Sequence, residues 1–226
     1  MSNTDSFIDE VTDEVRRDKL FAKFRRYGWI GAVAIVAIVA LAGYREWSIA
    51  EERAAAESLG DAMFEALALD AAAQGATKLT SLQAESAGGQ AVLGLIAASR
   101  FVDADDRRAA LDELAKVANN SEVPDVYRDL AVLHSVAISG RSLEPDARLA
   151  LLTPLSAPGE PFSVLAQEQS AYALLDRGDR IEAADKLESI LAADIPPSMR
   201  RRIQGILIAL GRNPVADASG EPGTSN

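Results

Sequence analysis

Residues 171–184 read AYALLDRGDRIEAA, and this stretch decides the fold class. A run rich in alanine and leucine leads into the break Arg177-Gly178-Asp179, and a second run of the same kind follows it. Alanine and leucine strongly favour helix, and a glycine between two such runs commonly ends the first of them. The stretch therefore predicts two antiparallel helices joined by a tight turn.

The two predicted helices, 163–176 and 180–193, present small and larger apolar side chains where they would cross. Small residues let helix axes approach closely, and larger ones fill the space between ridges. The prolines after Ile195 end the pair, and a last helix over 198–210 would cap a stack of helices. The residues expected to form the crossing and its turn are Ala173, Leu174, Gly178, Ala183 and Leu187.

Helical segments separated by short breaks extend back to about residue 50. Few residues are aromatic, and valine and isoleucine gather in one short stretch, which favours helix over sheet. The expected segments are 50–73, 76–85, 91–101, 107–118, 124–139 and 145–155, with breaks at Gly75 and at Ala87-Gly88-Gly89 among others. We therefore expect an all-α chain with a helical domain over 48–212. The end of the chain, 213–226, lacks apolar periodicity and is expected to be disordered.

Residues 27–44 read YGWIGAVAIVAIVALAGY and carry no charge. As a helix, 18 residues cover about 27 Å, close to the roughly 30 Å hydrocarbon core of a bilayer. Aromatic residues mark both ends, where amphipathic rings prefer the headgroup layer. The sequence thus predicts one transmembrane helix over 27–47, anchored by Tyr27, Trp29, Tyr44 and Trp47.

The charges beside this stretch predict its orientation. Six basic residues precede it closely, and only Arg45 and Arg53 follow soon after. Because positive flanks stay in the cytoplasm, residues 1–26 should form a cytoplasmic arm and the helical domain should lie in the periplasm, anchored to the cell inner membrane. The topology determinants are Arg16, Arg17, Lys19, Lys23, Arg25 and Arg26.

Two alternatives concern the N-terminal part. Ala40-Leu41-Ala42 resembles a signal-peptidase site, but a long lead with six acidic residues is unlike a signal peptide, so a retained anchor is favoured. The arm has a broken apolar stripe over 7–24. It either lies along the cytoplasmic membrane surface or extends the membrane helix, and the sequence leaves both open.

Composition excludes several functions. From Arg45 onward the chain has 17 basic and 28 acidic residues, which makes nucleic acid an unsuitable partner. Without cysteine there is no disulfide or thiolate metal site, and one histidine, His134, does not make a histidine metal site.

No catalytic motif is found either. Ser135 next to His134 is no dyad, because neighbours on a helix point in different directions. Asp103, Asp105 and Asp106 lack the rest of a calcium loop. Arg200-Arg201-Arg202 is either a partner surface or an ordinary exposed run. We expect a protein that is not an enzyme and has no cofactor, metal or small-molecule substrate.

The stretch 171–184 resembles the core of tetratricopeptide repeats, whose period is 34 residues; the other helix pairs match it only in outline, so the stack is expected to be degenerate. The whole chain apart from its tail resembles the YfgM family. Three stretches carry this resemblance: SFIDEVTDEVRRDKLFAKFRRYG at 6–28, VPDVYRDLAVL at 123–133, and LAQEQSAYALLDRGDRIEAADKLESILAADIPPSMRRRIQGILIALG at 165–211.

The resemblance implies an interaction scaffold that is ancillary to the SecYEG translocon in protein export and is linked to a periplasmic chaperone. The first helices of the pairs, 91–101, 126–137 and 164–175, are where such partners would be captured. The alternative is a structural accessory subunit of another inner-membrane complex, recruited through small residues of its membrane helix. Those residues are Gly31, Ala34, Ala37 and Gly43. The partner, the binding face and the oligomeric state stay open.

Overall fold

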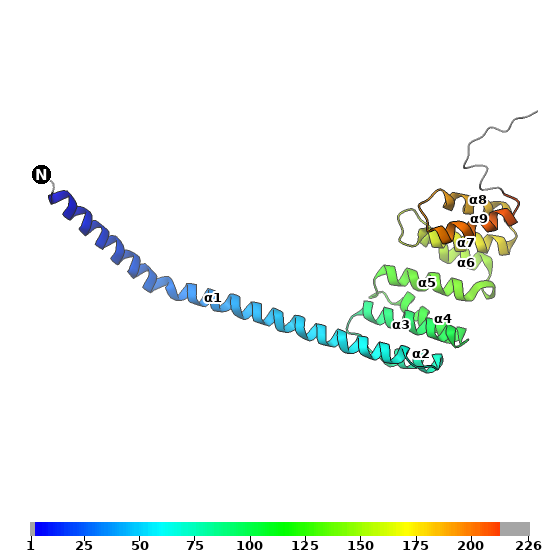
Figure 1. Ribbon diagram of the computed structural model, residues 1–226, viewed down its shortest axis with the longest axis horizontal. Helices are drawn as coiled ribbons and strands as arrows, with labels where there is room; N and C mark the ends of the chain where they lie inside the picture. The colour runs from blue at the N-terminus through cyan, green and yellow to red at the C-terminus, as the bar shows by residue number, and fades with distance from the viewer. Residues whose placement is uncertain (1–2, 213–226) are drawn as a thin grey trace, which may run out of the picture. The chain divides into compact units, whose positions relative to one another are not determined.

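The computed structural model describes the backbone of residues 3–212 and the side chains of residues 29, 33 and 35–212. Within that part every regular element is helical, which confirms the all-α prediction. The chain divides into two compact units, residues 1–58 and 59–226. The elements are α1 (Asn3–Leu67), α2 (Ala72–Ser81), α3 (Ala87–Asp103), α4 (Arg107–Asn119), α5 (Asp125–Ser139), the 3₁₀ turn η1 (Gly140–Ser142), α6 (Pro145–Leu155), α7 (Ser163–Arg177), α8 (Arg180–Leu191) and α9 (Pro197–Ala209) (Figure 1).

The first unit contains most of α1, and the last turns of this helix, from residue 59, belong to the second unit. In the first unit the described apolar side chains are exposed at successive positions, so they point to every side of the helix. The predicted anchor residues Trp29, Tyr44 and Trp47 are each more than 60% exposed, and the rings of Tyr44 and Trp47 are 6.3 Å apart. Tyr27 and the six basic topology determinants lie outside the side chains that the structure describes.

Among the described residues, no helix has a stretch that is both long and apolar enough to cross a membrane. Part of the predicted span, including Tyr27, Gly31 and Ala34, lies outside the described side chains. The transmembrane helix stays a prediction.

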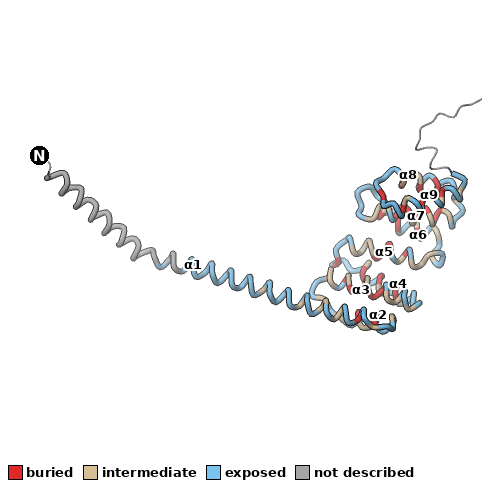
Figure 2. The backbone as a smooth tube through the Cα atoms, in the orientation of Figure 1, coloured by how far each residue is buried: buried red, intermediate tan, exposed pale blue. Residues whose placement is uncertain are grey.

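Four apolar clusters follow one another through the second unit, and three successive helices build each of them. The cores of these clusters appear as buried segments along α2 to α9 (Figure 2). Helices α3, α5 and α7 each contribute to two adjoining clusters, so each helix pair is covered by its neighbours. The clusters centre on Ala66, Leu79, Leu93 and Ala97; on Ala91, Ala98, Ala110, Leu114, Val117, Val123 and Ala131; on Leu133, Val136, Leu152, Leu155 and Ala166; and on Ala171, Ala184, Leu187, Ile190, Ile195, Met199, Ile203 and Leu207.

The helices form pairs whose first members are the end of α1, then α3, α5 and α7; α9 takes the place of a further first helix. First helices begin at Ala87, Asp125, Ser163 and Pro197, so the repeat length is 38, 38 and then 34 residues. The repeat is therefore present but uneven, as the sequence predicted.

The side chains predicted to form the crossing of α7 and α8 are buried. Ala173, Leu174, Ala183 and Leu187 are each at most 1% exposed. Gly178 ends α7 with φ of +101°, and the N–H of Asp179 donates to the carbonyl of Leu174. That left-handed conformation favours glycine at the end of a helix.

Two predicted breaks are wrong. Gly75 lies inside α2, where a Cβ would be 2.7 Å from the carbonyl oxygen of Ala66, so this glycine permits a close helix crossing rather than ending a helix. Residues 87–89 form the first turn of α3, which begins when the hydroxyl of Ser86 accepts a hydrogen bond from the N–H of Gly89. The predicted segment 50–73 ends earlier, at Leu67.

Replacing Ala183 with tryptophan should destabilise the second unit by about 1–3 kcal/mol, because a large side chain would overfill a crossing with no exposed surface. Urea unfolding of residues 59–212, followed by circular dichroism, measures this. The matched control is Ile181→Trp on the same helix, where the side chain is 74% exposed. Equal stability of the two variants would show that this crossing is not tightly packed.

Candidate interaction surface

Three first helices share a stripe of uncharged side chains that are exposed or partly exposed. Spacings of three, four or seven residues place these positions on one side of each helix. In a chain that is 25% charged, all ten of these positions lack a charge. We call it the uncharged band; it comprises Gly88, Val92 and Ser99 of α3, Val126, Leu130, His134 and Ala137 of α5, and Leu165, Gln169 and Tyr172 of α7.

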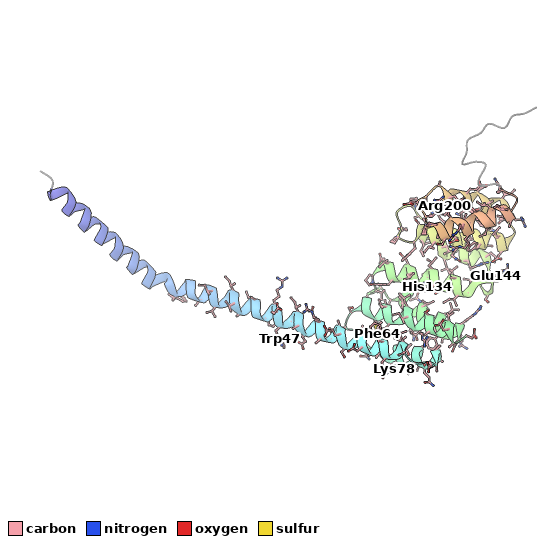
Figure 3. All side chains as sticks on the ribbon, in the orientation of Figure 1. Trp47, Phe64, Lys78, His134, Glu144 and Arg200 are labelled. Atoms are coloured by element: carbon pink, nitrogen blue, oxygen red, sulfur yellow. The ribbon has the colours of Figure 1, made fainter. Side chains whose placement is uncertain are left out.

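The three stripes occupy related positions on neighbouring helices. Val92 and Leu130 are 38 residues apart, as are His134 and Tyr172, which matches the spacing of the helix starts. Helix α3 packs on α5, and α5 also contacts α7. A Cβ at Gly88 of α3 would lie 3.6 Å from Cε2 of Tyr127 on α5, which shows how closely α3 and α5 approach each other. Figure 3 shows His134 on α5, in the middle of this series.

Charged side chains gather instead on the exposed sides of two second helices, α4 and α8. On α4 these include Asp112 and Lys116, and on α8 they include Glu182 and Asp185. Moving a charged side chain out of water costs free energy, so charged side chains favour exposed positions. The exposed sides of α4 and α8 thus carry charge, whereas the stripes on α3, α5 and α7 carry none.

An ion pair with a shared tyrosine fixes the α7 part of the band. Arg202 of α9 donates from Nε and Nη2 to the two carboxylate oxygens of Glu168, at 2.7 and 2.8 Å, and the hydroxyl of Tyr172 donates to Oε1 at 2.6 Å. The side chain of Glu168 is 3% exposed, whereas that of Arg202 is half exposed. Two parallel hydrogen bonds to one carboxylate hold both position and orientation, so α9 sets where Tyr172 lies.

The protonation states follow from these contacts. Burial raises the pKa of Glu168, but the hydrogen bonds from Arg202 and Tyr172 outweigh it and hold this pKa below its ordinary value of 4.5. Burial, together with the hydrogen bond to Glu168, raises the pKa of Tyr172 to about 12. At neutral pH the carboxylate is therefore ionised and the phenol keeps its proton.

The sequence did not predict this cluster. Arg200-Arg201-Arg202 was interpreted as either a partner surface or an exposed run; in the structure Arg202 binds Glu168, and Arg200 donates to the carbonyl of Leu191 near the end of α8. One signal of this contact was available in the sequence. Glu168 and Arg202 are 34 residues apart, which is one tetratricopeptide period. Within the described part, no three His, Asp or Glu side chains come close enough together to bind a metal.

Serial clusters, paired helices and an exposed band together define an α-helical repeat protein of the kind that binds other proteins. A family model for a tetratricopeptide repeat-like domain matches residues 23–211, and the chain belongs to this family. Domains of this type generally mediate protein–protein interaction and are typically not enzymes. No curated protein and no solved structure is significantly similar to the chain.

Replacing Glu168 with glutamine should destabilise the second unit mainly at neutral pH. Because the pKa of Glu168 is lower in the folded state, its ionised form stabilises the fold above about pH 4.5, and this contribution is lost as the pH falls through the folded pKa. Losing hydrogen bonds to a charged group should cost about 2 kcal/mol at pH 7.

Urea unfolding of residues 59–212 at pH 7 and pH 3 tests this prediction. Glu160→Gln, which changes an exposed loop carboxylate, is the control and should unfold like the parent at both pH values. A difference between E168Q and the parent that stays the same at pH 3 would contradict the assigned role of this carboxylate.

Proposed function

We propose that the protein is a membrane-anchored scaffold that holds another protein on the uncharged band, at the periplasmic face of the inner membrane. The uncharged band is the observation that supports this function. Removing water from uncharged side chains costs less than removing it from charged ones, and the cores of protein interfaces are depleted of charge and contain aromatic residues such as Tyr172.

The chemistry of the band suggests what its partner presents. Val126, Leu130 and Leu165 offer apolar contacts, while His134, Gln169 and the ring of Tyr172 offer polar groups at the edges of those contacts. A partner segment with apolar side chains, in a helix or an extended strand, fits this mixture. Binding through packing should be only moderately sensitive to salt, whereas binding steered by the net charge of −11 would weaken strongly as salt rises.

Membrane anchoring is supported by the first unit. Residues 27–44 have no charge, and the described apolar side chains of α1 are exposed on every side of the helix. A helix that is apolar all round is typical of a lipid environment or of a large core. The family match begins at residue 23, ahead of this stretch.

The finer role rests on the resemblance of three stretches to the YfgM family. In this role the scaffold stands beside the SecYEG translocon, the channel of protein export, and contacts a periplasmic chaperone through its helical domain. A stack of helix pairs supplies an extended surface suited to such contacts. The six basic residues before the apolar stretch support the orientation that places this domain in the periplasm.

A structural subunit recruited through the membrane helix is the second candidate. Gly43 on α1 has open space around it, since a Cβ there would meet nothing within 4 Å, and small residues let membrane helices pack closely. Exchanging residues 27–44 for an unrelated membrane helix separates the candidates. A scaffold keeps its partners after the exchange, and a subunit recruited through its helix loses them.

Photo-crosslinkers at His134 and Gln169 should capture translocon or chaperone subunits in intact cells, because both positions lie in the uncharged band. The matched positions are Asp112 and Asp185 on the charged second helices, which should capture much less of the same proteins. Capture from the second helices alone would place the binding surface elsewhere. Capture of an unrelated membrane complex from the band would support the band as the binding surface but would reject the role in protein export.

A reporter that is active only in the periplasm should be active when fused after Gly211 and inactive when fused after Asp9. The physical reason is the excess of basic residues before the apolar stretch. Activity in colonies and fusion levels in membranes are measured together. The reverse pattern would reject both the orientation and a periplasmic partner.

A further inference from the structure

The buried residues of the second helices show which positions of successive repeats correspond. Every second helix buries a residue at two corresponding positions. Both are 35 residues apart from α2 to α4, 38 from α4 to α6 and 35 from α6 to α8. The first position holds Gly75, Ala110, Arg148 and Ala183, and the second holds Leu79, Leu114, Leu152 and Leu187.

The first helices follow the same spacing. Each contributes a residue at a corresponding position to the apolar cluster of its own pair, and these residues are Met63, Ala98, Val136 and Ala171. The next residues along the four helices are Phe64, Ser99, Ala137 and Tyr172. Because the last three belong to the uncharged band, Phe64 is the position at which the same surface continues onto the end of α1.

Phe64 is 74% exposed, and Figure 3 shows it on the last turns of α1. Met63 and Ala66 on the same turns pack into the stack, so the ring of Phe64 lies on the opposite side of the helix. Buried aromatic side chains are frequent anchors of protein interfaces. Phe64 and Tyr172 thus place an aromatic ring at each end of the series, and the small residues Ser99 and Ala137 lie between them.

A carboxylate accompanies the ring on α1. Asp61 is exposed and lies three residues before Phe64, which places both side chains on one side of the helix. The corresponding residues of α3, α5 and α7 are Ile96, His134 and Gln169, none of which is acidic. At these positions the surface is therefore acidic only where it reaches α1.

We propose that the partner surface extends from Tyr172 on α7 to Phe64 on α1, and that it takes a segment of another protein that is apolar along its length and has a lysine or arginine at the end that meets Asp61. The proposal rests on the proposed function, because it assumes that the uncharged band binds a protein. A cation beside Asp61 is favoured by the carboxylate and by the face of the Phe64 ring. At the other end Arg202 is already paired with Glu168, so charge gives the bound segment a direction.

The spacing of the helices sets the length of this segment. Packed helices lie about 10 Å apart, so the three intervals from α1 to α7 cover about 30 Å. An extended chain advances about 3.3 Å per residue. A segment of about nine extended residues therefore reaches from Phe64 to Tyr172.

Photo-crosslinkers at Phe64 and at Gln169 of the full chain, in intact cells, test this extension, with the captured residues of the partner identified by mass spectrometry. Both positions should capture one protein at sites about nine residues apart, with a lysine or arginine next to the site captured from Phe64. The control is Ile181 on α8, which is also 74% exposed and should not capture this segment.

The outcomes separate the extension from the proposed function. Capture of a protein at Gln169 but not at Phe64 would overturn the extension and leave the proposed function standing. Capture from Phe64 of a second copy of this chain, or of an acidic segment, would also overturn it. Capture at neither position would reject the proposed function and the extension together.

Reversing the charge of Asp61 tests the direction. D61K should lower capture at Gln169 by about fivefold or more, because like charges that face each other across an interface oppose binding. D61N should lower it less and should make capture from solubilised membranes less sensitive to salt. D112K on the exposed side of α4 is the matched control and should capture as the parent does. Equal capture by D61K and D112K would overturn the assigned role of Asp61.

Discussion

The sharing of first helices between adjoining clusters is the constraint on which the rest of the structure depends. Helix α7 buries Ala166 in the cluster with α5 and α6, and Ala171 in the cluster with α8 and α9. A helix covered on two sides has one side left, and on α7 that side carries Leu165, Gln169 and Tyr172. Alanine at the crossings keeps the helices close, so the exposed sides of successive first helices become neighbours. The position of the uncharged band is therefore a consequence of how the core is divided.

Electrostatics complements this arrangement. The exposed sides of α4 and α8 carry charged side chains, while the band has none. Two charged side chains are buried among the described residues, Arg148 and Glu168. At Glu168, three hydrogen bonds from two partners compensate the buried charge. That carboxylate lies one tetratricopeptide period before Arg202, and the pair ties the last helix to the preceding repeat. The end of the stack is thus held by a specific polar contact in addition to apolar packing.

Sequence reasoning predicted the helix pairs where local signals were unambiguous. The turn at Gly178 was one of these, because glycine, alanine-rich flanks and later prolines all indicated the same boundaries. It failed at Gly75 and at Gly88-Gly89, because a glycine that permits a close helix crossing has the same local sequence as one that ends a helix. The Glu168–Arg202–Tyr172 cluster depends on contacts between distant residues, which a local pattern does not reveal. The membrane anchor is predicted by an uncharged stretch whose side chains the structure describes only in part, so it stays a prediction.

The central claim is that the uncharged band binds the partner, and placing charges in the band tests this most directly. Affinity purification of the full chain from solubilised membranes would compare H134E/Q169E, which adds two carboxylates to the band, with T153E/S189E, which adds two at exposed positions on second helices. The account predicts that co-purifying proteins are lost from the first variant and retained by the second, with both variants folded. Retention of the partners by H134E/Q169E together with their loss from T153E/S189E would contradict it.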